Sequence, residues 1–383
     1  MNISTMMTTA VLNRTAATLP FTGCDNYTDN GGQIAYAIFL AFVLLFCILG
    51  NSLVCIAIAL SPRLREKPTN YFIISLAVSD MCYAISQCPI RISKILHNQV
   101  FCFDINVCRF FILTDLITTP ATIITLLVVA IDRFFCITKP FFYQQHMTKT
   151  KAMVIIACIW SYSCLWSSLS FISWQSPPVY PTIFINKSNH VCVITNQYFY
   201  MTSYFVVIIV PLFIMAVAYL AILRVAVVQI RAIHATEVHV PQESNDMDNK
   251  RDARMSKSPR RNNRELRATA TLAIVYGAFF VCWFPPSVLN IYIGFEGPAQ
   301  LIQLQQTNLG LFEFIFYTFA EILPTLSTAI NPIIYNVFNR QFRTAFKAVF
   351  FRIAGRSDIL RRSTIARELE LTTNRRATID INN

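Results

Sequence analysis

The sequence predicts an all-α membrane protein, a bundle of seven transmembrane helices followed by a short amphipathic helix. Of the 383 residues, 55% are hydrophobic and only 14% are charged, whereas soluble domains carry about 25% charged residues. The apolar residues fall in blocks of about twenty or more, the length that crosses a hydrocarbon core. Lys and Arg concentrate in a subset of the loops, which is typical of cytoplasmic loops. The net charge of +12 therefore reflects orientation in a membrane and does not indicate nucleic-acid binding.

The first span is expected near Gln33–Leu60, because residues 30–62 contain no charge. Three cations follow it directly and place the first loop in the cytoplasm. Residues 1–32 are then extracellular, and the C-terminus is cytoplasmic. Four N-x-S/T sequons, which mark glycosylation sites, fall on the predicted outer side; they are headed by Asn2, Asn13, Asn26 and Asn186.

The other spans complete a transmembrane domain over residues 33–338. They are expected at about Tyr71–Ile95, Cys108–Pro140, Ala152–Trp174, Tyr198–Leu223, Ala268–Ile293 and Leu309–Phe338. The cytoplasmic segment 224–267 is rich in Lys and Arg, and its part Ala235–Asn263 has no periodicity, which predicts a flexible loop.

The amphipathic helix is expected over residues 339–352. Phe342, Phe346 and Phe350 recur every four residues, so they form one apolar face that is predicted to lie on the inner leaflet. Residues 353–383 are polar and are predicted to be a disordered cytoplasmic tail. Short basic motifs in this tail are similar to kinase sites, so a kinase and an arrestin are candidate partners besides membrane lipid.

The third span carries a charged residue near each end. Eighteen residues separate Asp115 from Arg133, which is five helical turns, so both side chains share one helix face. Sixteen uncharged residues lie between Asp115 and Asp132, a length of about 24 Å. This helix is predicted to connect an outer ligand pocket to an inner switch.

Asp80 lies in the middle of the second span, where a carboxylate is costly and usually functional. Hydroxyl, amide and carboxylate oxygens suit a small hard cation such as Na⁺. The candidate oxygen donors are Thr122, Ser327 and Asn331. No other cofactor is predicted. The alternative is a structural carboxylate held by these same neighbours.

Four cysteines lie outside or at the edges of the apolar runs, on the predicted outer side, and four cysteines allow three pairings. They are Cys24, Cys102, Cys108 and Cys192. The other eight lie in or beside apolar runs and are interpreted as buried hydrophobic residues.

Ordered motifs over about Gly50–Phe350 resemble the rhodopsin-like class of G-protein-coupled receptors. They are Gly50-Asn51, Leu76–Asp80, Asp132-Arg133-Phe134, Trp160, Pro211 with Tyr219, Phe279–Pro285 and Asn331–Tyr335. Phe134 stands where the family usually has tyrosine, while the two charges before it are present. One such motif is weak evidence, but the whole set in order is specific.

The resemblance implies a set of roles. Cys108 pairs with Cys192. Separately from the resemblance, Cys24 and Cys102 are candidates for a second outer disulfide; the alternative is that Cys102 competes with Cys108 for Cys192. Arg133 pairs with Glu265 in the inactive state and contacts a heterotrimeric G protein in the active one. The remaining switch residues are Ile123, Pro211, Phe279 and Trp283 beneath the ligand, Tyr219 and Tyr335 beside the arginine, and Asp132, Asn331 and Pro332 in the motifs.

The outer half resembles the biogenic-amine receptors. By its spacing from Cys108 and Arg133, Asp115 matches the aspartate that binds a protonated amine. The other pocket candidates are Thr119, Ser203, Tyr204, Trp283, Phe284, Ser287 and Asn290. Phe284 is expected to form an aromatic wall for the cation.

The seventh span departs from the amine pattern. Amine receptors usually place tryptophan and tyrosine where this chain has Ile322 and Thr325, and the tyrosine normally braces the aspartate. Glu321 is a second candidate pocket carboxylate, and two carboxylates favour a diamine or a small basic peptide as alternative ligands. A retinal-binding opsin is disfavoured, because the seventh span has no lysine.

Two other classes are considered. A transporter or channel would explain the spans and intramembrane charges, but not the ordered motifs, and the chain shows no internal repeat. An enzyme is disfavoured, because the sequence shows no metal cluster, nucleophile–base pair or phosphate loop. The sequence therefore predicts a multi-pass receptor of the plasma membrane.

Overall fold

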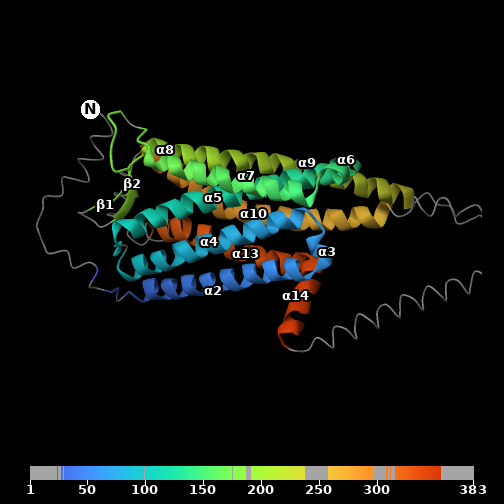
Figure 1. Cartoon of the computed structure of the whole chain (residues 1–383), viewed down its shortest axis with the longest axis horizontal. Coiled ribbons are helices and arrows are strands. Elements are labelled where there is room, and N and C mark those ends of the chain that lie inside the picture. Colours follow the sequence, from blue (N-terminus) through green and yellow to red (C-terminus); the bar gives the residue numbers. More distant parts are fainter. Residues whose placement is uncertain are drawn as a thin grey trace, which may run out of the picture.

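The computed structural model describes residues 24, 27–28, 30–98, 100–174, 176–186, 191–237, 258–296, 308, 311 and 315–354. Long helices run side by side along the molecule (Figure 1). The long helices and helical segments are α2 (Gly31–Leu60), α4 (Thr69–Leu96), α5 (Ile105–Thr138), α7 (Lys149–Ser168), α9 (Val210–Glu237), α10 (Ser258–Glu296) and α13 (Leu323–Phe338). The short elements are α3 (Pro62–Arg65), α6 (Pro140–His146), η1 (Leu169–Phe171), α8 (Gln197–Thr202) and α14 (Arg340–Ile353).

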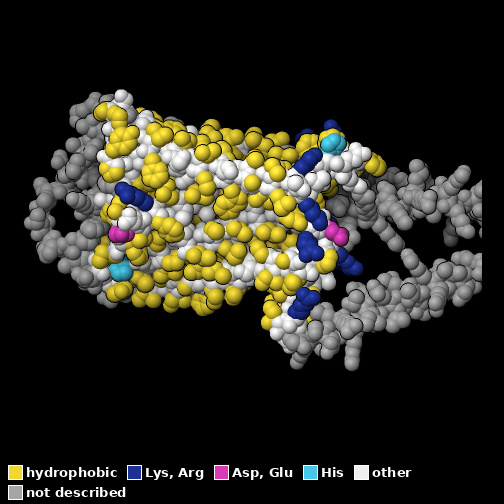
Figure 2. All heavy atoms as spheres, viewed as in Figure 1, with side chains coloured by type: hydrophobic (Ala, Val, Ile, Leu, Met, Phe, Trp, Pro, Cys, Tyr) yellow, Lys and Arg dark blue, Asp and Glu magenta, His cyan; other side chains and the backbone are white. Residues whose placement is uncertain are grey.

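Within the described part of the chain, six helical stretches are long and apolar enough to cross a membrane. They are Gly31–Leu60, Thr69–Leu96, Ile105–Thr138, Lys149–Phe171, Tyr198–Val225 and Ala273–Tyr292. A seventh helix runs over residues 316–338, and the expected start of this span near Leu309 lies outside the described residues. Figure 2 shows hydrophobic side chains along the length of the bundle and charged side chains at its two ends. This distribution is that of a membrane-spanning bundle.

Capping side chains explain where several helices begin. Asn30 accepts a hydrogen bond from the Gly32 backbone at 2.9 Å, and Asp104 accepts one from Val107 at 3.0 Å. Thr148 does the same for Lys151 at 3.3 Å. The first turns of a helix leave backbone N–H groups without partners, and these side chains satisfy one each. The caps therefore fix the register of α2, α5 and α7.

Two prolines within the spans lie just after π-helical segments. Ser203–Ile209 and Phe316–Ile322 are π-helical. Pro211 lies two residues after the end of the first segment, and Pro324 lies two residues after the end of the second. The Val210 backbone donates to Phe205, five residues earlier, in place of the usual four. Proline has no N–H and crowds the preceding turn, and a wider turn relieves both problems. α4 also contains Pro89, which the sequence interpretation did not single out.

The outer end is closed by a hairpin that the sequence did not predict. β1 (Ile183–Asn186) pairs antiparallel with β2 (Val191–Ile194) at the end opposite α14 (Figure 1). Cys192 on β2 is disulfide-bonded to Cys108 at the start of α5, which confirms that pairing. Cys24 is bonded to Cys102, so the second expected disulfide is also present. Both disulfides fix loops over the outer end of the bundle.

The inner end differs from the sequence prediction in two ways. α9 continues to Glu237 and α10 begins at Ser258, so both helices extend into the segment 224–267 that was predicted as a loop. Short helices α3 and α6 turn the chain between spans. α14 lies across the bundle end (Figure 1).

The phenylalanine face of α14 is turned mostly toward the protein. Phe342 stacks on Tyr335 at 5.2 Å, and both Phe342 and Phe346 are buried. Phe350 is 59% exposed and is the one of the three that is available to lipid. The prediction that all three phenylalanines anchor the helix in the leaflet is therefore wrong for two of them.

Candidate ligand site and cytoplasmic switch

α5 carries the two charges around which both candidate sites are built. Asp115 lies on the outer half of α5. Its side chain is half-buried and accepts a hydrogen bond from Thr119 at 3.1 Å. Arg133, five turns further, is buried with 6% of its surface exposed. The predicted placement of one carboxylate and one guanidinium on the same helix is thus present in the structure.

A chain of polar groups lies across α8, the first π-turn and α10. The Tyr200 hydroxyl donates to the Asn290 amide oxygen at 2.9 Å and lies within hydrogen-bond distance, 3.2 Å, of the Tyr204 hydroxyl. Tyr204 is within electrostatic range of Asp115. The structure therefore brings together Asp115, Tyr204 and Asn290, and adds Tyr200, which the sequence interpretation missed.

Ser203, a candidate ligand contact, has a partner within the protein. It accepts a hydrogen bond from the Trp166 indole at 3.1 Å. Trp166 lies on α7, and no periodicity in the sequence links it to the fifth span. A hydroxyl that accepts from the indole can still donate to a ligand.

The floor of the candidate pocket is a tryptophan held by two serines. The Trp283 indole donates to the Ser327 hydroxyl at 3.1 Å, and Ser287 donates to the Trp283 carbonyl at 2.7 Å. Trp283 also stacks on Phe279 at 5.7 Å. Because Ser327 lies on α13, the Trp283 side chain joins the sixth and seventh helices beneath the pocket.

Thr325 stands where the resemblance expects a bracing tyrosine. It is 1% exposed, and its hydroxyl has no hydrogen-bond partner among the described residues. It does not reach Asp115, whose hydrogen bond within the described chain is the one from Thr119. Thr325 therefore does not support Asp115 as the tyrosine at this position does in amine receptors.

Glu321 is not a free pocket carboxylate, and the prediction that it offers a second site for a cationic ligand is wrong. It forms an ion pair with Arg91 of α4, and Lys94 lies 3.6 Å from its other oxygen. Arg91 also donates to the Tyr83 hydroxyl at 3.1 Å. A cation inside a predicted span is costly without a partner, so Arg91 was itself a signal that could have identified this pair.

Phe284 does not form the expected buried wall. Its side chain is 39% exposed and stacks on Phe280 at 4.8 Å. Trp283, the preceding residue, is 8% exposed. Adjacent residues on a helix point about 100° apart, and here the tryptophan takes the inward position.

The surroundings of Asp80 contain one of the three predicted partners. The Asn331 amide donates to its carboxylate at 2.8 Å. Thr122 instead donates to Ser79 at 2.9 Å, and Ser327 donates to the Pro324 carbonyl at 2.6 Å. Asp80 is 1% exposed. The seventh span therefore reaches the second through Asn331.

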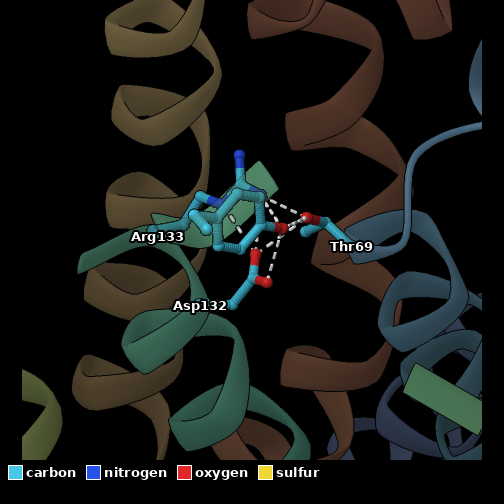
Figure 3. A network of polar contacts seen from close by, with 4 residues as sticks. Thr69, Asp132 and Arg133 are labelled. Atoms are coloured by element: carbon cyan, nitrogen blue, oxygen red, sulfur yellow. Dashed lines mark hydrogen bonds and ion pairs between the residues drawn. The ribbon is translucent and has the colours of Figure 1, made fainter. Parts of the chain in front are cut away.

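At the inner end, Asp132 gathers three donors around its carboxylate (Figure 3). Thr69 donates to it at 2.7 Å, Tyr143 at 2.7 Å, and Arg133 at 2.6 Å. Thr69 opens α4 and Tyr143 lies on α6, so α4, α5 and α6 meet at this point. Burial raises the pKa of Tyr143, and the Asp132 charge adds to this, so the phenol remains a donor at neutral pH.

Arg133 is therefore held by its own helix neighbour and by Thr69. Thr69 and Tyr143 were not among the predicted switch residues. The side chain of Glu265, the predicted partner of Arg133, lies outside the described residues. The pairing of Arg133 with Glu265 therefore remains a prediction.

Other predicted switch residues lie in one apolar cluster below the pocket. Ile123, Phe279 and Trp283 belong to it. Tyr219 stacks on Tyr276 at 5.1 Å, and the Tyr276 hydroxyl donates to the Leu212 carbonyl at 2.9 Å. Pro211 is buried beside Leu212 in the chain. Pro332 packs closely against Gly50, where a Cβ atom would lie 2.9 Å from the proline ring.

The side chains of the four glycosylation candidates are not among those that the structure describes. Asn2, Asn13 and Asn26 lie outside the described residues, and the side chain of Asn186 on β1 is not described. These sites remain predictions.

Comparison with known proteins assigns most of the bundle to one family. The family model described as "7 transmembrane receptor (rhodopsin family)" matches residues 50–335. The chain is 30% identical to the D(1A) dopamine receptor of Xenopus laevis, over 83% of this chain and 72% of that one. It is 30% identical to the D(1A) dopamine receptor of Didelphis virginiana, over 84% and 74%. It is 29% identical to the D(1) dopamine receptor of Carassius auratus, over 83% and 88%.

Proposed function

Because the chain belongs to the rhodopsin family of seven-transmembrane receptors, we propose that it binds a small protonated amine and activates heterotrimeric G proteins. The observation that carries the ligand class is the half-buried Asp115 carboxylate, held by Thr119 from the same helix. A carboxylate in a partly dry site makes a charge-assisted hydrogen bond to an ammonium group. The similarity to dopamine receptors supports the same class of ligand.

The far end of the ligand lies against the polar chain from the fifth and sixth helices. Tyr200, Tyr204 and Asn290 are already hydrogen-bonded to one another. Groups that are fixed before binding lose less entropy when a ligand arrives. Glu321 no longer supports a basic-peptide ligand, because Arg91 and Lys94 occupy it.

Activation is a shift between two packings of the bundle. The ligand contacts residues above Trp283, whose indole joins α10 to α13 through Ser327. At the inner end, Arg133 is engaged with Asp132 and Thr69, and it must leave at least part of this network to contact a G protein. A ligand moves this equilibrium only if it binds the active packing more tightly than the inactive one.

The receptor is oriented in the plasma membrane with its N-terminus outside. Both disulfides and the β1–β2 hairpin lie at one end of the bundle. Disulfides persist in oxidising, extracellular surroundings. The basic residues that follow α2 lie at the other end, beside α3, as expected of a cytoplasmic surface.

Agonist-stimulated nucleotide exchange on heterotrimeric G proteins is the direct test of receptor function. In membranes that contain this receptor and heterotrimeric G proteins, an amine agonist is expected to accelerate GTPγS binding several-fold. The second measurement uses vesicles that contain the purified protein. These vesicles are expected to show no agonist-dependent flux of ions or solutes. Flux without nucleotide exchange would assign the protein to the transporter or channel class.

Asp80 is the proposed site of an allosteric Na⁺ ion, with the Asn331 side chain as its neighbour. The Asp80→Asn substitution removes the charge that holds the ion, so agonist affinity should become insensitive to NaCl. Wild-type affinity should fall as NaCl rises at constant ionic strength, with N-methyl-D-glucamine chloride as the replacement salt. An equal response to the two salts in the wild type would argue against a sodium site.

A further inference from the structure

Among the residues that the structure describes, the outer half of the bundle contains four charged side chains that are shielded from solvent. Arg91 and Lys94 project from α4, Asp115 from α5 and Glu321 from the second π-turn. Arg91 is paired with Glu321 and lies within electrostatic range of Asp115. Asp104 and Arg109, the charged residues at the outer end of α5, are both exposed.

These four charges cancel, since two are carboxylates and two are cations. A pocket with a single carboxylate becomes neutral when a singly charged amine binds. Here the four described side chains already sum to zero charge, and a simple amine would leave the group with a net positive charge. A net charge in a low-dielectric site is unfavourable because its solvation is lost. A ligand that brings one positive and one negative charge keeps the pocket neutral.

The two cations are not equally held. Arg91 makes a close contact with Glu321 and donates to Tyr83 at 3.1 Å. Lys94 lies 3.6 Å from the other Glu321 oxygen, and its ammonium is 6.0 Å from the centre of the Phe111 ring. Its side chain is 19% exposed, against 11% for Arg91. Lys94 is therefore the cation that an incoming anionic group can engage without breaking the buried pair.

We propose that the natural ligand is a zwitterion, a small amine that also carries one acidic group, with its ammonium on Asp115 and its acid on Lys94. The inference rests on the proposed function, because it assigns the second charged group of the same ligand. Arg91 adds a second positive charge on the same helix as Lys94. The Tyr83 hydroxyl accepts a hydrogen bond from Arg91 and fixes the position of the guanidinium. Glu321 forms ion pairs with both cations and so keeps their side chains turned toward the seventh helix.

The test compares amines with their acid-bearing counterparts. The pairs are tyramine with tyrosine, dopamine with L-dihydroxyphenylalanine, tryptamine with tryptophan, and propylamine with 4-aminobutanoate. Potency is measured as GTPγS binding in washed membranes, which contain no free amino acids. In at least one pair, the acid-bearing member is expected to be at least about tenfold more potent, the value of one charge-assisted contact.

Variants of Lys94 then assign the effect to this side chain. Lys94→Gln should abolish the preference for the acid-bearing member and raise the potency of the plain amine, because one carboxylate charge is then left for the ammonium to neutralise. Lys94→Arg should restore the preference, because the charge returns. Arg109→Gln is the matched control, since it removes a cation from the same end of the bundle at an exposed position.

The outcomes separate this inference from the proposed function. If the plain amine is equal or better in every pair, the zwitterion inference is overturned. A preference that survives in Lys94→Gln also overturns it. If agonists act equally well on Asp115→Ala, the proposed amine site itself fails. Loss of amine potency in Asp115→Ala, with no acid preference in the wild type, supports the site and rejects the zwitterion.

Discussion

Asp115→Ala is expected to reduce the potency of amine agonists about 100-fold. The Asp115 carboxylate is half-buried, and its hydrogen bond in the described chain comes from Thr119, so an ammonium group gains a strong ionic contact there. Hydrogen bonds to charged groups contribute about 1.5–3 kcal/mol, and 1.4 kcal/mol is a tenfold change in affinity. The measurement is a concentration–response curve for GTPγS binding, at matched receptor density on the cell surface.

Asp115→Asn separates the charge from the shape of the side chain. Asparagine keeps an oxygen that can accept from Thr119, but it has no charge to attract an ammonium. We therefore expect Asp115→Asn to lose nearly as much potency as Asp115→Ala. Thr119→Ala, which removes the hydrogen bond and keeps the carboxylate, should lose tenfold or less by the same scale. Wild-type potency in Asp115→Asn would contradict an ionic contact.

Glu321→Ala is expected to lower surface expression and thermal stability severely. The substitution leaves Arg91 without its carboxylate and Lys94 without the neighbour at 3.6 Å. Breaking a buried ion pair from one side costs about 3–5 kcal/mol, because the remaining charge stays in a low-dielectric site. The measurement is the half-life of ligand-free receptor in detergent at a fixed temperature, together with the amount at the cell surface.

A double substitution tests this reason. Arg91→Ala combined with Glu321→Ala leaves no buried partner of the pair behind, so it should be more stable than Glu321→Ala alone. Glu66→Ala, at an exposed carboxylate beside α3, is the control and should resemble the wild type. If Glu321→Ala alone were as stable as the wild type, the ion pair would not hold α4 to the seventh helix.

The positions of residues along each helix were largely predictable from the sequence, because they depend on spacing within helices. Asp115 and Arg133 lie on one helix, and Asn331 contacts Asp80, as the motif order implies. The length of uncharged segments also located the spans to within a few residues. Both features follow from the periodicity of a helix and the thickness of a bilayer.

The contacts between helices were not predictable in the same way. Trp166 contacts Ser203, and Arg91 contacts Glu321, across sequence separations for which no periodicity exists. Such pairs depend on how whole helices rotate and pack. Tyr143 on α6 belongs to the same group, because a short helix in a loop has no apolar stripe that shows where it docks.

The two π-turns have a consequence for how the bundle can move. A π-turn holds one residue more than an α-turn, and one residue corresponds to about 100° of rotation. Ser203 lies in the first wide turn and Glu321 in the second, while α9 and α13 continue below them toward the cytoplasm. Gain or loss of a wide turn would twist the inner part of a helix about its own axis while the outer part stayed bound to its neighbours. In these two helices, a change in the wide turn would therefore reach the cytoplasmic end as a rotation of the helix.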